Sequence, residues 1–484
     1  MQNTKLTTPN KTGISTDLKA RMPRPRIGLL QAGHRYYWDQ FPRLKEMGKA
    51  MLQDFVAKLE KIGEVMLSDL SDTEEEAIKA GDYFKEQDID ILLVFPLGYT
   101  PGMCVLPTVE RCRNVPLRII NAHEDSSYDY KNADTTLYLH HEAVCCIPEY
   151  AAGLVATGRK FKVRSGPFSS RKLWKQISAD CLGAAVARRF KELRFGLIGH
   201  TYPGMSDVPI DEFRLITSTG KQVVRPEVEE IEEAYKRVTE VDLERMYAEL
   251  RELYDVDETV TNEHMTISAK LTIAYEEVIR KHNISGFGYY WWGEKKFITA
   301  LRSESAVAVS RLSSMGCPGV TEGDIKTAMA MKIMDLMGCG GMFLEFFSID
   351  YDGNFILMGH DGPANIAVRQ GKARLTHLDV HHGKSGEGLG IDFYVKEGTV
   401  TLLNLTRDIH GTFKLLYTIG EVIPGDILSI GNPNCRIKID MPMDDFIDAW
   451  CQHGPTHHTS LGIGDCSGEI EMFGEAMGFP VHRF

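Results

Sequence analysis

The stretch RIGLLQA at residues 26–32 is the first strand-like segment of the chain, and it opens a regular alternation. The run 41–61 carries apolar residues at helical spacing, and a Glu-rich run from Thr73 has the pattern of a second helix. Apolar strand candidates follow at IDILLVF (89–95) and LRIINA (117–122). Strands that alternate with helices predict a parallel sheet covered by helices.

The same alternation starts again in the middle of the chain. RFGLIGH (194–200) leads into charged helices around 228–251 and 263–282, and GFGYYWW (286–292) follows. After about residue 340, short β-rich runs separated by Gly, Asn and Asp predict an antiparallel barrel or sandwich. We therefore expect an α/β protein with two open α/β domains in series and a β-rich C-terminal domain. The expected boundaries are an N-terminal tail at 1–25, then domains at 26–178, 179–340 and 341–484.

The composition is that of an ordinary globular protein, with 43% hydrophobic and 25% charged residues among 484. A formal net charge of −12 argues against nucleic acid or an anionic membrane as the main partner. The N-terminal tail lacks the apolar core of a signal peptide, and no apolar run is long enough to span a bilayer. Ten scattered cysteines without a C-x-x-C pair favour reduced thiols, so we expect a cytoplasmic protein.

One acid interrupts an apolar run in the stretch 342–364, MFLEFFSIDYDGNFILMGHDGPA. Burying Glu345 is costly unless it is paired, hydrogen-bonded or bound to a metal, or unless it lies at a strand edge where it reaches water. His360 ends the next apolar run, just before a Gly-Pro turn. Such strand ends are favoured places for ligands, although a structural histidine explains the position equally well.

Further candidates lie on either side of this stretch. Glu322 precedes a helix of amphipathic pattern in GVTEGDIKTAMAMKIMDLM, where an acid also complements the helix dipole. His453, His457 and His458 stand among Gly, Pro and Thr in QHGPTHHTSLGIGD, and the two adjacent histidines in this loop indicate a metal more than a core. Two glutamates with one or two histidines suit Mn²⁺ or a similar divalent ion.

Two other sequence patterns suggest a different functional site. GKS at 383–385 resembles the end of a P-loop, but Leu378 stands where a glycine is required, so we reject it. The second is a cluster of possible metal ligands that would suit a metal-dependent hydrolase, a runner-up interpretation. Its members are His377, Asp379, His381 and His382.

The chain from about residue 26 resembles the L-arabinose isomerase family of aldose–ketose isomerases, most clearly in its C-terminal half. TEGDIKTA around Glu322 is similar to the family's G-E-G-D-x-K-T-A, and FLE at 343–345 is similar to its F-x-E strand. ILMGH at 356–360 resembles the strand that ends in a ligand histidine, and PTHHT at 455–459 resembles G-x-H-H-T. RFGLIGHTYPGM (194–205) resembles the glycine-rich turn that starts the second domain.

This resemblance implies two Rossmann-like domains followed by a β-barrel. It implies Glu322, Glu345, His360 and His458 as metal ligands, with Mn²⁺ the first choice and Co²⁺ or Mg²⁺ as alternatives. The two glutamates would also act as acid and base, and a pentose or related aldose, L-arabinose first, would interconvert with its 2-ketose by hydrogen transfer between C1 and C2. A homo-oligomer, a hexamer, is implied as well.

The pocket wall departs from the family. Where the arabinose enzymes present a glutamine and a histidine, this sequence aligns Glu142 and Cys145 in HHEAVCCIPE (140–149), a segment expected to approach a neighbouring subunit's site. The loop after the first strand, AGHRYYW, is bulkier, with His34 near a substrate-contacting glutamine. The resemblance therefore supports the family's metal chemistry in this protein better than it supports the family's sugar specificity. Glu142, Cys145 and His34 stay candidates for substrate binding.

We expect His457 and His458 to have different roles. Successive side chains of an extended segment point to opposite faces, so we expect only one of them to reach the ion. The resemblance assigns His458 to the metal and leaves His457 to contact substrate or orient the ligands. The alternative from another class is a non-catalytic sugar-binding protein, because two α/β lobes also build such receptors, which need no metal.

Overall fold

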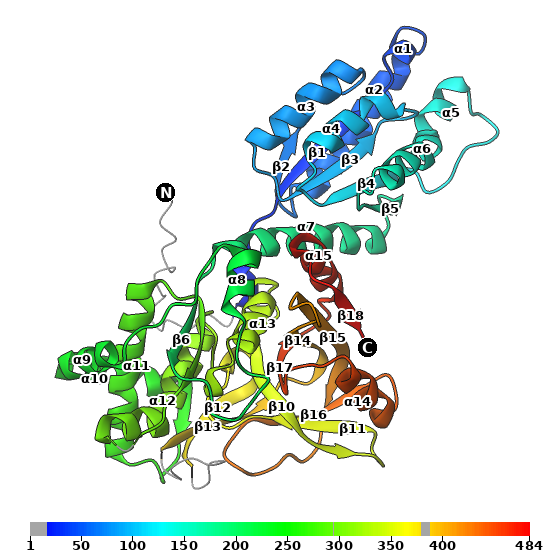
Figure 1. Ribbon diagram of the computed structural model, residues 1–484. Helices are drawn as coiled ribbons and strands as arrows, with labels where there is room; N and C mark the ends of the chain where they lie inside the picture. Colours follow the sequence, from blue (N-terminus) through cyan, green and yellow to red (C-terminus); the bar gives the residue numbers. More distant parts are fainter. Residues whose placement is uncertain (1–16, 294, 379–387) are drawn as a thin grey trace. The chain divides into compact units, whose positions relative to one another are not determined.

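The computed structural model describes residues 17–293, 295–378 and 388–484, and Figure 1 labels its helices and strands. Contacts divide the chain into two compact units. The smaller unit comprises Pro23–Arg189 and Gly468–Gly478, and the larger comprises the described residues of 17–22, Phe190–Ser467 and Phe479–Phe484. None of the described helices combines the length and the apolar character needed to cross a membrane.

The smaller unit is built on a five-stranded parallel sheet of order β2-β1-β3-β4-β5. Its strands are β1 (Arg26–Ala32), β2 (Glu64–Leu67), β3 (Ile91–Pro96), β4 (Leu117–His123) and β5 (Lys162–Pro167). This is a doubly wound order, in which ligands bind beyond the carboxyl ends of the strands. The alternation predicted from the sequence is confirmed here.

Helices cover both faces of this sheet because its strands are apolar on both sides. Ile27 and Leu29 of β1 pack in one core with residues of α2 and α7, and Leu30 and Ala32 pack in a second core with α3, α4 and α6. The helices are α1 (Arg35–Trp38), α2 (Pro42–Leu59), α3 (Glu74–Glu86), α4 (Leu106–Arg111), α5 (Thr135–His141), α6 (Ala143–Ala156), α7 (Arg171–Glu192) and α15 (Ser467–Met477). Thr73 caps α3 by accepting a hydrogen bond from the Glu76 N–H, as its pattern predicts.

The larger unit begins with a second parallel sheet, of order β6-β8-β9. Its strands are β6 (Phe195–Gly199), β8 (Gly286–Tyr290) and β9 (Gly319–Val320). The helices are α8 (Glu212–Thr219), α9 (Val228–Arg237), α10 (Glu240–Leu253), α11 (Asn262–His282), α12 (Lys296–Ser314) and α13 (Ile325–Leu336). A short 3-10 turn, η3 (Thr321–Gly323), connects β9 to α13.

Six antiparallel strands of the larger unit close into a barrel, in the order β14-β17-β10-β11-β16-β15, because β14 also pairs with β15. They are β10 (Met342–Asp350), β11 (Phe355–Gly359), β14 (Gly398–Arg407), β15 (Phe413–Ile423), β16 (Asn434–Ile439) and β17 (His458–Ile463). Helix α14 (Met443–Gln452) precedes β17, and β18 (Val481–Arg483) adds to β15 in parallel. The C-terminal β-rich region is thus a barrel and not a sandwich.

Two of the strands expected in this barrel lie elsewhere. β12 (Arg369–His377) and β13 (Leu389–Val395) pair with each other and, through β12, with β7 (Tyr254–Val256) in a separate three-stranded sheet. Leu375 and Ile391 are buried there together with Tyr254. A short apolar run predicts a strand but does not determine its partner, which explains the difference.

Candidate metal centre

Four of the predicted site residues come from four different elements of the larger unit. Glu322 lies in η3, directly after β9, and Glu345 lies in β10. His360 follows β11, and His458 is the first residue of β17. Because β10 pairs with both β11 and β17, Glu345 lies opposite Gly359 on one side and His458 on the other.

The side chains of three of these residues converge. One donor atom from each of Glu322, His360 and His458 lies within 4.8 Å of the others, and a second group of the same kind joins Glu345, His457 and His458. The Nε2 atom of His458 is 3.1 Å from Oε2 of Glu322, and Nε2 of His360 is 4.0 Å from Oε1 of the same carboxylate. The structure therefore brings the four predicted ligands into two overlapping groups that share His458.

The outer nitrogen of each imidazole is already engaged. Nδ1 of His458 lies 3.0 Å from Oδ2 of the fully buried Asp324, and Nδ1 of His360 lies 2.7 Å from the carbonyl oxygen of Asp361. In both rings Nε2 is therefore the nitrogen that faces Glu322. Metal-binding histidines are oriented in this way by a carboxylate or carbonyl on the second nitrogen.

Phe343 sets the spacing of the two rings. It is buried in β10, with its ring centroid 4.2 Å from that of His360 and 4.5 Å from that of His458. Side chains two residues apart in a strand share a face, so Glu345 leaves β10 on the same side as Phe343. One strand thus supplies both the apolar floor and an acid.

The expectation that the two adjacent histidines point to opposite faces is wrong. Their ring centroids are 3.8 Å apart, and Nε2 of His457 lies 3.7 Å from Oε2 of Glu322. Strand alternation does not apply because His457 lies in a bend before β17. Asp207 holds it there, accepting hydrogen bonds from its backbone N–H at 2.8 Å and pairing with Nδ1 at 2.7 Å. His453, by contrast, lies near the carbonyl of Ala449 and outside both groups.

The backbone at Glu322 is unusual. Its φ is 63°, in the left-handed region, and the next residue, Gly323, has a φ of 76°. A Cβ at Gly323 would lie 2.5 Å from the His200 carbonyl oxygen, so glycine is required there. Non-glycine residues in this conformation are strained and concentrate at functional sites.

The electrostatics favour an ionised Glu322. Burial acts to raise the pKa of Glu322, but the neighbouring imidazoles of His457, His458 and His360 outweigh it and hold that pKa well below its ordinary value. Burial lowers the pKa of His360, which therefore stays neutral with a lone pair available. Lys326, buried beside the site, donates to the carbonyl oxygens of Asp207 and Val208 at 2.6 and 2.9 Å.

Glu345 is less buried than its apolar surroundings suggest. It is half-buried, and its carboxylate forms no hydrogen bond or ion pair with another residue in the described part of the chain. Its strand is an interior strand of the barrel, so the side chain reaches water without lying at a sheet edge.

The residues present fit a divalent cation. Oε2 of Glu322 and Nε2 of His458 are buried and have no hydrogen-bond partner among the described residues, although they face one another. Buried polar atoms left without partners are rare and point to an ion or water. Carboxylate oxygens and imidazole nitrogens without sulfur suit Mn²⁺ and related ions.

The three predicted substrate residues lie in the smaller unit and form no part of this cluster. The ring of His34 lies 4.6 Å from that of Tyr37 and 5.9 Å from that of Tyr99, just beyond β1. Glu142 follows α5 and accepts a hydrogen bond from the Tyr138 hydroxyl at 2.5 Å, and Cys145 is exposed on α6. Their roles stay predictions.

The competing hydrolase cluster is only partly described. His377 ends β12, with its ring 5.3 Å from that of His264. Asp379, His381 and His382, like the GKS stretch at 383–385, lie outside the described residues.

Sequence reasoning missed the residues that position the candidate ligands. Asp324, Asp207 and Asp361 were not singled out, although Asp324 belongs to TEGD and Asp361 follows His360 directly. Their adjacency to predicted ligands was the available signal for two of them. Asp207 is separated from His457 by 250 positions, so no local pattern identifies it.

Comparisons with known proteins agree with the resemblance. Residues 212–340 match the family model described as the L-arabinose isomerase central domain. The chain is 21% identical to the L-arabinose isomerase of Bacillus subtilis over 317 residues, 63% of this chain and 62% of that protein. It is 20% identical to that of Halalkalibacterium halodurans over 440 residues, 88% of this chain and 87% of the relative.

A third relative, the L-arabinose isomerase of a Thermotoga species, is 26% identical over 244 residues, 48% of each chain. The first relatives are matched over less than two thirds of their own length, as the 62% for the Bacillus subtilis protein illustrates. The sequence matches, the two parallel sheets and the closed barrel all agree with the resemblance stated from the sequence. The chain therefore resembles the L-arabinose isomerase family, through the family's central domain at residues 212–340 and at low identity to the proteins that carry that name.

Proposed function

We propose that this protein is a divalent-metal aldose–ketose isomerase of the L-arabinose isomerase type. The observation that carries the proposal is the convergence of Glu322, His360 and His458, with Glu345 in an overlapping group. The unpartnered atoms of Glu322 and His458 support a cation between them. The relatives named L-arabinose isomerase support the reaction class.

Glu322, Glu345, His360 and His458 would hold the ion, with Mn²⁺ the first choice. A bound divalent ion polarises a carbonyl and fixes two neighbouring oxygens of an open-chain sugar. Asp324 and Asp361 keep the imidazole Nε2 atoms of His458 and His360 directed inward, so that the ligand geometry exists before substrate arrives.

The two glutamates would share the proton transfers. In the aldose-to-ketose direction one hydrogen leaves C2 and one is gained at C1, while a proton passes from O2 to O1. Glu345 has a carboxylate without a hydrogen bond or ion pair to another described residue, so it is free to carry a proton at carbon. Glu322 is engaged by His458 and is better placed to serve oxygen.

A small cavity of about 20 Å³ lies next to the chain neighbour of Glu322, and one hydroxyl group of the sugar would enter it. Its lining includes Thr321, the chain neighbour of Glu322, with Tyr289, Trp291 and Arg302. Nε of Arg302 is buried without a hydrogen-bond partner among the described residues, so this guanidinium has a donor available for a sugar hydroxyl.

The substrate is proposed to be a pentose or related aldose, with L-arabinose the first to test. Glu142, Cys145 and His34 depart from the family pattern, so we propose an altered preference among aldoses. By resemblance, the segment 140–149 of one subunit would approach a neighbour's site in a homo-oligomer, a hexamer.

We also propose a cytoplasmic location. None of the ten cysteines forms a disulfide, and eight of them are buried. Cysteines without disulfides are typical of a reducing compartment.

An aldose panel tests the function. Purified protein, stripped with a chelator and then supplied with Mn²⁺ or Co²⁺, is incubated with L-arabinose and other aldoses, and ketose formation is measured. We expect turnover only after metal is restored. Failure to convert any aldose, with substrate binding retained, would favour a sugar-binding protein. A wide margin for L-arabinose would show that the three departing residues do not determine specificity.

A further inference from the structure

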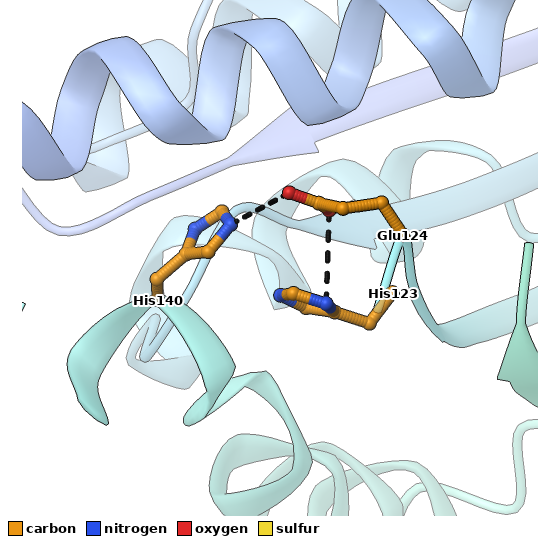
Figure 2. A group of neighbouring side chains, drawn as sticks. All are labelled: His123, Glu124 and His140. Atoms are coloured by element: carbon orange, nitrogen blue, oxygen red, sulfur yellow. Dashed lines mark hydrogen bonds and ion pairs between the residues drawn. The ribbon is translucent and has the colours of Figure 1, made fainter. Parts of the chain in front are cut away.

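A second group of potential metal ligands lies in the smaller unit, at the carboxyl edge of its sheet. His123 is the last residue of β4, Glu124 follows it, and His140 lies in the last turn of α5. Figure 2 shows the carboxylate of Glu124 between the two imidazole rings. The site is therefore built from two regular elements and the residue that directly follows β4.

The three side chains are close enough to share one ion. Nε2 of His140 lies 3.1 Å from Oε1 of Glu124, and Nδ1 of His123 lies 3.7 Å from Oε2 of the same carboxylate (Figure 2). One donor atom from each residue lies within 4.8 Å of the others. His123 also belongs to a second group with Asp125 and His141, so two further potential ligands lie close to the first three.

The cluster contains carboxylates that are not paired with a Lys or Arg among the described residues. Glu124 and Asp125 form ion pairs only with histidines among the described residues. No Lys or Arg among the described residues pairs with these two carboxylates, so a metal ion would supply the positive partner that they lack.

The hydrogen bonding of the cluster is also incomplete. His140 is 1% exposed, and its Nδ1 atom, like Nε2 of His123, is buried without a partner among the described residues. The Asp125 N–H donates to Nδ1 of His123 at 3.1 Å, a bond that an ion at this nitrogen would replace. Glu124 is 36% exposed at its side chain, which leaves a path from solvent.

We propose that His123, Glu124 and His140 form a second divalent-metal site. Two imidazoles and one carboxylate, with no sulfur, suit a first-row ion such as Zn²⁺ and leave coordination positions open. The position fits the rule that doubly wound sheets bind ligands beyond the carboxyl ends of their strands. This proposal does not rest on the isomerase function, because the two candidate sites use different residues.

Metal binding by the full chain tests it. Chelator-treated protein is dialysed against Zn²⁺, and bound metal is measured for the wild type, Glu124→Gln, His140→Gln, His458→Asn and the control His410→Gln. His410 is exposed and belongs to neither cluster. Glu124→Gln preserves the shape of the side chain and a hydrogen bond to His140, so it is the variant least prone to misfold, and circular dichroism checks its fold.

We expect two ions per chain in the wild type and in His410→Gln, and one in each of the other three variants. Affinity at the altered site should fall by at least about tenfold, the range seen when ligand shells are damaged. Equal binding by wild type, Glu124→Gln and His140→Gln would overturn the second site. So would a single ion in the wild type that His458→Asn removes. Loss of an ion in Glu124→Gln but not in His458→Asn would support the second site while contradicting the first.

Discussion

Glu322 owes its position to the backbone as much as to its side chain. It follows β9 in a left-handed conformation, and its carbonyl oxygen accepts a hydrogen bond from the Tyr202 N–H at 2.9 Å. Gly323 lies against the His200 carbonyl, which leaves no room for a larger residue. The carboxylate is thereby directed toward His458 instead of capping α13, whose N-cap is Asp324.

The two adjacent histidines provide the first prediction at this scale. His458 is buried, with its Nε2 turned to Glu322, whereas His457 is partly exposed and is bound by Asp207. We expect His458→Asn to lose bound metal and activity together, and His457→Asn to keep the metal and lose only part of its activity. Metal titration with activity assays compares them. Release of the ion by His457→Asn alone would mean that the motif is aligned one residue off.

Arg302 provides the second prediction at the scale of single residues. It lines the cavity beside Glu322 and has a buried Nε donor without a partner among the described residues. Arg302→Ala should raise KM for the best aldose by about tenfold to a hundredfold, because one hydrogen bond from a charged group contributes about 1.5–3 kcal/mol. Bound metal should not change. Arg251→Ala, on the exposed end of α10, is the control. An unchanged KM in Arg302→Ala would exclude this residue from the substrate site.

Residues with a chemical reason to be unusual could be predicted from the sequence. Glu345 interrupts an apolar run, and His360 ends one, so their types alone made them candidates. Asp207 could not be predicted, because it meets His457 only through the tertiary fold. The convergence of the His457 and His458 rings was also mispredicted, since a bend in place of a strand decides it.

At the scale of elements, β10 organises the candidate site. It pairs with β11 and β17, which places His360 and His458 on its two sides, and Phe343 packs against both rings. Helix α13 begins at Ile325, and the side chain of its N-cap, Asp324, also lies 3.0 Å from Nδ1 of His458. The start of this helix and the orientation of a candidate ligand therefore depend on the same carboxylate.

Asp335, near the end of α13, provides the third prediction. It is 2% exposed and pairs with Lys332 at 3.0 Å and with Arg21 at 2.5 Å. Burial acts to raise its pKa, but these two cations outweigh burial and lower that pKa below its ordinary value. Asp335→Asn should therefore reduce the free energy of unfolding by about 3–5 kcal/mol at neutral pH, the range for a broken buried ion pair.

The pH dependence of this difference follows from the lowered pKa. The stabilisation is fully present above the unfolded pKa of about 3.9 and is lost as pH falls through the folded pKa. Urea unfolding at neutral pH and below about pH 3.5 should show the gap between wild type and Asp335→Asn closing in acid. Asp255→Asn, an exposed acid paired with Lys372, should change stability by under about 0.5 kcal/mol. A gap that is equal at both pH values would contradict the ion-pair account.

Element types could be predicted from periodicity, but strand partners could not. The apolar runs of β1, β3 and β4 each gave a strand in the expected place. β12 and β13 were also predicted as strands, yet they form a sheet with β7, which follows α10 much earlier in the chain. Hydrogen bonds between distant strands depend on the packing of whole helices, which a local pattern does not contain.

At the scale of the whole molecule, the C-terminal segment Gly468–Gly478 returns to the smaller unit. Arg118 of β4 is fully buried there and pairs with Asp180 of α7 and Glu475 of α15, each at 2.9 Å. A buried guanidinium is tolerated when carboxylates surround it. This connection was not predicted, since the sequence places Arg118 and Glu475 357 positions apart.

The fourth prediction concerns assembly. By resemblance we expect a homo-oligomer, whose segment 140–149 approaches a neighbouring subunit's site. Sedimentation of the active protein should give a mass several times the 54.4 kDa of one chain. Val144→Asp, a charge introduced at an exposed apolar position of that segment, should shift the protein toward smaller species and reduce activity in parallel. Val241→Asp, at an exposed apolar position of α10, is the matched control. A fully active monomer would refute the expected assembly.

The central claim is that turnover requires a metal ion held by Glu322, Glu345, His360 and His458. The most direct measurement is aldose turnover as a function of fractional Mn²⁺ loading, in a Glu124→Gln background that removes ions from the second candidate site. We predict turnover proportional to bound metal with no activity at zero loading, and none at any loading in Glu322→Gln or Glu345→Gln chains that remain folded. Full turnover by metal-free protein, or by either glutamine variant, would contradict the account.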